Sequence, residues 1–141
     1  MDGIRGTKEG TMRASVLMLL LCAACSSVTG VELDEEFAQR VGEQATVQSV
    51  DLTIRFETVA QDSRCPLRAE CVWAGDAAVV LTTWTTTEPA RVDTLHTGLE
   101  PSALVRGGVT VELIGLDPHP EVPGSIAQAR YRARLVVRPL R

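Results

Sequence analysis

Two cysteines in the middle of the chain, Cys65 and Cys71, are spaced for the chemistry of a local disulfide bond. Closing so short a loop constrains the unfolded chain and stabilises the fold by about 2 kcal/mol. A structural zinc site is the alternative, but it needs about four ligands. The two histidines of the chain lie far from both cysteines in the sequence. We therefore predict a Cys65–Cys71 disulfide.

A third cysteine, Cys25, points to a different chemistry. Residues 14–24 form an apolar run that follows Arg13 and ends in two alanines. The run is about half as long as a bilayer-spanning helix, which needs about 20 residues. This pattern resembles a bacterial lipoprotein export signal, in which the cysteine after the cleavage point becomes the lipidated N-terminus. A membrane anchor that is retained and a simple secretory signal are the alternatives.

The expected processing fixes the compartment and the layout of the chain. Residues 1–24 are the predicted lipoprotein signal peptide, with Met12 as an alternative start. Residues 25–34 are small and polar enough to be a tether, and residues 35–141 are the predicted domain. Disulfides persist outside the cytosol. We expect anchoring to the membrane through the lipid, in the outer membrane facing the periplasm if the host has two membranes.

The segment around the disulfide contains the candidate binding residues Asp62, Arg64, Arg68 and Trp73. One interpretation is purely structural: Asp62 accepts a backbone N–H in a turn, Arg64 pairs with Asp62 or Asp76, and Trp73 covers the disulfide. The functional interpretation is that the closed loop presents its side chains rigidly to a partner. Preorganisation of this kind lowers the ordering cost of binding.

Two runs in this segment, Asp-Ser-Arg-Cys-Pro at residues 62–66 and Cys-Val-Trp-Ala-Gly at residues 71–75, resemble the motif of a known group. The group consists of small bacterial secreted proteins and lipoproteins that have no assigned activity. The resemblance extends to the valine-rich strands around the motif and to a closing strand that contains Tyr131. It implies a compact β domain, and it implies no substrate.

A metal site is a weaker possibility. Asp117 and His119 lie close together in a proline-rich turn, and His96 lies in a strand region. Carboxylate and imidazole groups are common metal ligands, but His96 would have to converge on the turn. We expect no cofactor and no metal, and we keep these three residues as an alternative.

The charge pattern narrows the class of partner. The chain has a net charge of −4, which argues against non-specific nucleic-acid binding. Arg130, Arg132 and Arg134 alternate along one predicted strand face. They could form a basic stripe for anionic head groups, or pair with acids across the sheet. The sequence lacks hydrolase motifs and a phosphate-binding glycine loop, so we predict that the protein is not an enzyme.

Strand signals dominate the predicted domain. Leu52, Ile54 and Phe56 alternate with polar residues, which is the period of a half-buried strand. Residues 77–86 are apolar on both faces and predict a central strand. Residues 35–41 suit a short helix or a first strand, and residues 125–129 one helical turn. Further strands are expected at residues 91–95, 109–113 and 130–138.

About seven short strands with turns between them predict an all-β fold, an antiparallel β-sandwich or a small barrel with one local disulfide. The expected function is that of a lipid-anchored binding or assembly module of the cell envelope that acts without catalysis, on an envelope protein partner. The alternative is a periplasmic carrier of a small ligand or metal.

Overall fold

The computed structural model describes residues 28–140. The predicted signal peptide and the predicted lipidation site Cys25 lie outside these residues. No helix within residues 28–140 is long and apolar enough to cross a membrane. The strands are β1 (Val28–Gly30), β2 (Glu36–Arg40), β3 (Gln44–Val47), β4 (Leu52–Asp62), β5 (Ala77–Trp84), β6 (Arg91–His96), β7 (Ala103–Arg106), β8 (Val109–Asp117) and β9 (Arg132–Pro139), with 3₁₀ turns η1 (Gln48–Val50) and η2 (Gln128–Arg130).

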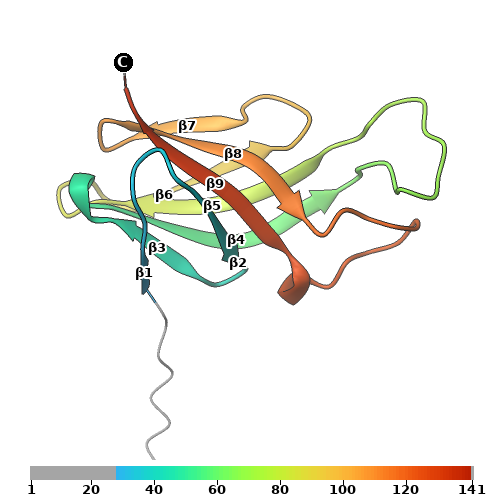
Figure 1. Ribbon diagram of the computed structural model, residues 1–141, viewed down its shortest axis with the longest axis horizontal. Helices are drawn as coiled ribbons and strands as arrows, with labels where there is room; N and C mark the ends of the chain where they lie inside the picture. The colour runs from blue at the N-terminus through green and yellow to red at the C-terminus, as the bar shows by residue number, and fades with distance from the viewer. Residues whose placement is uncertain (1–27, 141) are drawn as a thin grey trace, which may run out of the picture.

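The strands form two sheets that face each other, as Figure 1 shows. One sheet has the order β1-β3-β4-β5-β6 and the other the order β2-β9-β8-β7. Within residues 28–140 every strand pair is antiparallel except β1 with β3, which is parallel. The predicted all-β sandwich is therefore confirmed, and the barrel alternative is wrong because the sheets do not close.

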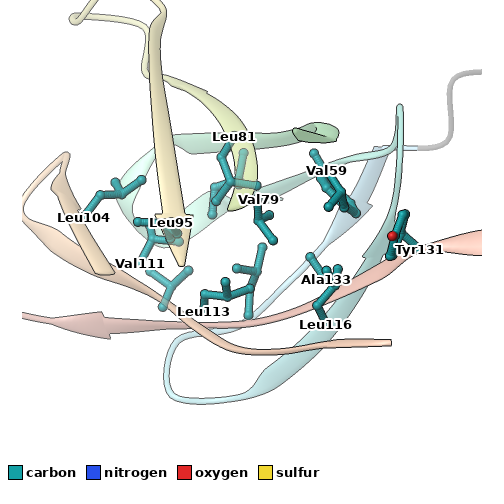
Figure 2. Close-up of a cluster of buried hydrophobic side chains, with 14 of the residues drawn as sticks. Val59, Val79, Leu81, Leu95, Leu104, Val111, Leu113, Leu116, Tyr131 and Ala133 are labelled. Atoms are coloured by element: carbon teal, nitrogen blue, oxygen red, sulfur yellow. The ribbon is translucent and has the colours of Figure 1, made fainter. Parts of the chain in front are cut away.

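The core lies between the sheets and is mostly aliphatic. The alternation predicted for β4 is confirmed, since Leu52, Ile54 and Phe56 are fully buried. In β9 the alternating residues Ala133, Leu135 and Val137 are buried too. Figure 2 shows how side chains from both sheets meet, with Tyr131 among them. Burying aliphatic side chains contributes about 1.5–3 kcal/mol each and is the main stabilising term of the sandwich.

Residues 28–140 contain nine strands instead of about seven, because short strands carry too few residues for a clear alternation. These are β1, β3 and β7, of three or four residues each. Residues 35–41, for which helix and strand were both open, contain strand β2. The helical turn expected at residues 125–129 is the 3₁₀ turn η2, which begins three residues later and ends one residue later.

Residues 28–34, which the sequence places in the expected tether, lie on the sandwich. β1 pairs with β3, and the amide of Val31 donates to the carbonyl of Thr46 at 3.1 Å. Val31 and Leu33 pack against the core. Small and polar composition alone predicts a flexible segment. This segment instead packs on the sandwich through two apolar side chains at alternate positions.

Candidate functional site

The predicted Cys65–Cys71 disulfide is confirmed, with an S–S distance of 2.04 Å. It closes the connection between β4 and β5, residues 63–76, which we call the cystine loop. In Figure 1 this loop projects from one end of the sandwich, and the connection from β8 to η2 projects from the same end. We call residues 118–127 of that connection the proline loop.

The base of the cystine loop continues the pairing of β4 with β5. The amide of Ser63 donates to the carbonyl of Asp76 at 2.7 Å, and the amide of Cys65 donates to the carbonyl of Ala74 at 2.7 Å. Gly75 allows this close return, because it has a φ of +73° and a Cβ there would lie 1.9 Å from the Ser63 carbonyl oxygen. Any other residue would combine a left-handed conformation with a backbone clash.

Arg64 lies beneath the loop instead of on its surface. Its residue exposure is 8%. Its guanidinium donates to both carboxylate oxygens of Asp62, from Nε at 2.9 Å and from Nη2 at 2.7 Å. A bidentate Arg–carboxylate pair of this kind is the strong form of the interaction. The predicted Arg64–Asp62 pair is therefore confirmed.

The same guanidinium joins the cystine loop to the other sheet. Its Nη1 donates to the carbonyl of Leu116 at the end of β8, and its Nη2 donates to the carbonyl of Pro118 at 2.9 Å. Buried polar groups must be satisfied in this way, because an unpaired buried charge is costly. The side chain is thus used inside the domain, and the prediction that Arg64 contacts a partner does not fit its burial.

Tyr131 completes this buried cluster, which we call the Asp62–Arg64–Tyr131 network. Its hydroxyl donates to Asp62 Oδ2 at 3.0 Å. Burial opposes ionisation of Asp62, but hydrogen bonds from Arg64 and Tyr131 outweigh it and lower the pKa of the carboxyl. Burial and the neighbouring Asp62 carboxylate raise the pKa of Tyr131 to about 12. Figure 2 shows Tyr131 at one end of the core.

The proline loop fixes the outer part of the cystine loop. The amide of Leu67 donates to the Pro120 carbonyl at 2.9 Å, and the amide of Arg68 donates to the Glu121 carbonyl at 3.0 Å. His119 Nε2 donates to the Cys65 carbonyl at 2.8 Å. These bonds to backbone groups mean that the cystine loop is held on both sides, by its disulfide and by a neighbouring loop.

Large apolar side chains stand out from this rigid support. Leu67 is 70% exposed, Val72 92% and Trp73 79%. We call these three residues the apolar tip. Trp73 therefore does not lie buried over the disulfide as the structural interpretation expected. Arg68, also exposed, is 3.7 Å from the Glu121 carboxylate at the edge of the tip, and such exposed pairs add little stability.

Sequence reasoning missed two residues that matter here. Val72 is the most exposed large apolar residue of residues 28–140, and the sequence contains a signal for this exposure: Val72 lies between a cysteine and a tryptophan in a loop too short to bury it. Tyr131 was assigned only to the core. A buried tyrosine hydroxyl needs a hydrogen-bond partner, and that requirement predicts an acceptor such as a carboxylate near Tyr131.

The three alternative metal ligands have separate partners. His96 Nδ1 is 2.6 Å from Asp76 Oδ2, Asp117 Oδ2 is 3.1 Å from Arg134 Nε, and His119 bonds to a backbone carbonyl. Burial opposes ionisation of Asp76, but bonds from His96 and from the Gly98 amide lower its pKa. Within residues 28–140 no three His, Cys, Asp or Glu side chains are grouped so that they could hold a metal ion.

Comparison with known proteins finds no match to this chain among protein-family models, curated proteins or solved structures.

Proposed function

We propose that this protein is a non-catalytic binding or assembly module of the cell envelope, anchored by a lipid at Cys25, and that the apolar tip is its docking surface for an envelope protein. The observation that carries the proposal is the exposure of Leu67, Val72 and Trp73 on one rigid loop. Exposed apolar patches on soluble domains mark interaction sites. Tryptophan in particular supplies a large share of the binding energy at protein interfaces.

The rigidity of the loop supports a binding role beyond mere exposure. A flexible loop loses conformational entropy on binding, about 0.5–1.5 kcal/mol for each side chain that becomes ordered. Here the disulfide, the proline loop and the Asp62–Arg64–Tyr131 network hold the base of the cystine loop and its residues 65–68 before a partner arrives. The partner that fits this surface is a protein with an apolar groove or patch, with Arg68 and Glu121 at the polar rim.

Crosslinking inside cells tests the docking surface. A photoreactive residue replaces Val72, and a second strain carries the same residue at Val92, which is 64% exposed on β6. We expect a discrete crosslinked envelope protein from position 72 and none from position 92. The same product from both positions, or none from position 72, would contradict the proposal.

The anchor has its own test. Cys25→Ala removes the proposed acylation site, so we expect the protein to leave the membrane fraction. Its mass must show that the signal has been cleaved, because an uncleaved apolar segment would hold the chain in the membrane by itself. A cleaved Cys25→Ala protein that stays in the membrane fraction would contradict lipid anchoring.

A further inference from the structure

Two arginines of one sheet and a third on the adjoining 3₁₀ turn form a cluster that the function proposed above does not use. Arg40 ends β2, Arg130 ends η2, and Arg132 begins β9. All three are exposed, and together they line an open pocket of about 400 Å³. Asp117, Pro118 and Ala129 complete the pocket lining. Three arginines that line one pocket bring three positive charges to this region of a chain whose net charge is −4.

Among residues 28–140, these three are also the arginines with no ion pair to another described residue. Within residues 28–140, every other arginine lies within ion-pair distance of a carboxylate; these are Arg55, Arg64, Arg68, Arg91, Arg106, Arg134 and Arg138. The sequence suggested that Arg130, Arg132 and Arg134 form one basic stripe. The structure instead pairs Arg134 with Glu36 and Asp117 and replaces it in the cluster with Arg40 from the neighbouring strand.

The sheet register places two of the charges against each other. Arg40 and Arg132 are directly opposite in the antiparallel β2–β9 pair, and like charges at such positions are destabilising. Asp117 is opposite Arg132 on the other side, but its carboxylate is taken by Arg134 at 3.1 Å. Gly115 makes that possible, because a Cβ at residue 115 would lie 2.5 Å from Arg134 Nη2. One carboxylate oxygen of Asp117, the acid in the pocket lining, is thus engaged by Arg134.

From this arrangement we propose that Arg40, Arg130 and Arg132 form a binding site for a phosphate group. Guanidinium groups bind phosphate oxygens through paired, charge-assisted hydrogen bonds. A bound dianion would also relieve the repulsion between Arg40 and Arg132. The phosphate group can come from the head group of an anionic phospholipid or from a soluble phosphate, and the chemistry is shared.

The position of the pocket favours the head group. Val28, the first residue of β1, is opposite Gln44 in the β1–β3 pair. Gln44 follows Arg40 across the short turn that joins β2 to β3, in which the Glu43 amide donates to the Arg40 carbonyl at 3.0 Å. Figure 1 shows η2 and the start of β1 on the lower side of the view. Three extended residues reach at most about 11 Å, so a lipid on Cys25 would hold this side near the membrane. This last step alone depends on the proposed anchor.

Nuclear magnetic resonance on the full chain tests the site, in maltoside micelles that contain no phosphate. One arm adds inorganic phosphate, one adds phosphatidylglycerol to the micelles, and one adds zwitterionic phosphatidylcholine. We expect the amide signals of Arg40, Ala129 and Arg132 to shift with inorganic phosphate and with phosphatidylglycerol, and less with phosphatidylcholine. Shifts with inorganic phosphate but none with phosphatidylglycerol would support the site and assign it a soluble ligand.

Variants decide whether the three arginines are responsible. Arg132→Ser should weaken phosphate binding about tenfold, the effect of losing one charge-assisted contact, while Arg91→Ser on β6 should leave it unchanged. Arg132→Ser should also keep the thermal midpoint, since it removes a like-charge contact. No shift with either anion, or shifts that survive in Arg132→Ser, would overturn the proposal. The inorganic phosphate arm gives this answer even if Cys25 carries no lipid.

Discussion

The inner and outer parts of the cystine loop differ in which side chains they bury and which they expose. Arg64 and Trp73 lie nine residues apart, and from the sequence both are candidate contacts for a partner. The structure buries Arg64 in hydrogen bonds to Asp62, Leu116 and Pro118, whereas Trp73 stands in solvent. The polar residue is internal and the apolar residue is external, which reverses the usual preference of these side chains.

The buried side chain is suited to supporting the loop, and the exposed side chain is suited to recognising a partner. A buried ion pair is weak evidence for net stability, but losing one partner of such a pair is costly. An exposed apolar side chain gives little to folding and leaves its apolar area available for an interface. The Asp62–Arg64–Tyr131 network holds the loop, and the apolar tip is the surface that we propose for docking. Variants of the network should lower the free energy of unfolding, whereas variants of the tip should impair binding and leave that free energy nearly unchanged.

The largest effect is expected for Arg64→Ala. The change leaves the Asp62 carboxylate buried without its partner and two backbone carbonyls without a donor, so the free energy of unfolding should fall by about 3 kcal/mol. Arg55→Ala is the control, since Arg55 forms an exposed pair with Glu57 at 3.5 Å and should lose less than about 1 kcal/mol. Denaturant unfolding followed by circular dichroism measures both. Equal losses in the two variants would contradict a supporting role for Arg64.

The next effect is that of the disulfide. Replacing Cys65 and Cys71 by serine together should lower the free energy of unfolding by about 2 kcal/mol under oxidising conditions. A reducing agent should destabilise the native protein by a similar amount and leave the double variant unchanged. If reduction had no effect on the native protein, the disulfide would not be contributing to stability.

A smaller effect is expected for Tyr131→Phe, about 1 kcal/mol at neutral pH from the lost hydrogen bond. The pKa of Tyr131 is raised from 10.0 to about 12, so the native state holds this proton more tightly than the unfolded state. The contribution of the Tyr131 hydroxyl to the free energy of unfolding should therefore be fully present below pH 10 and be lost as the pH rises from 10 to about 12. The chain has one tyrosine, so ultraviolet titration reports this hydroxyl alone. Titration near the ordinary pKa would contradict the network.

Asp62, the acid of the same network, should give stability the opposite dependence on pH. The pKa of Asp62 is lowered in the native state, so its contribution is present above the ordinary carboxyl value of 3.8 and is lost as the pH falls through the lowered pKa. Asp62→Asn should therefore show a weaker loss of stability in acid than the native protein. An unchanged acid profile would mean that Asp62 titrates alike in both states.

The smallest effect on stability is expected at the apolar tip. Leu67→Ser with Trp73→Ser should change the free energy of unfolding by no more than about 0.5 kcal/mol for each residue, as is usual for exposed positions. The same denaturant measurement used for Arg64 gives the comparison. A loss as large as that of Arg64→Ala would show that the tip supports the fold.

Much of the sandwich could be predicted because its signals are local. The alternation of Leu52, Ile54 and Phe56 marks β4, and the same period marks β9. The disulfide followed from the cysteine count. β1 was missed because three residues cannot establish a period, and its parallel partner β3 begins well along the chain at Gln44.

The site was harder to predict because its decisive contacts are distant in sequence. Arg64 donates to carbonyls that lie 52 and 54 residues away in the sequence. No local sequence pattern predicts an acceptor at such a separation. The arginine cluster of Arg40, Arg130 and Arg132 shows the same limit. Arg130 and Arg132 were visible as part of a stripe, but only the β2–β9 register brings Arg40 to them.

The measurement that tests the division between support and recognition most directly is the crosslink yield at position 72 in three backgrounds. One is the native chain, one is Leu67→Ser with Trp73→Ser, and one is Val92→Ser with Val105→Ser, two exposed valines on β6 and β7. We predict that the envelope crosslink is lost only in the tip variant, while all three proteins stay folded and their free energies of unfolding differ by no more than about 1 kcal/mol. An undiminished crosslink in the folded tip variant would contradict the assignment of the tip to docking.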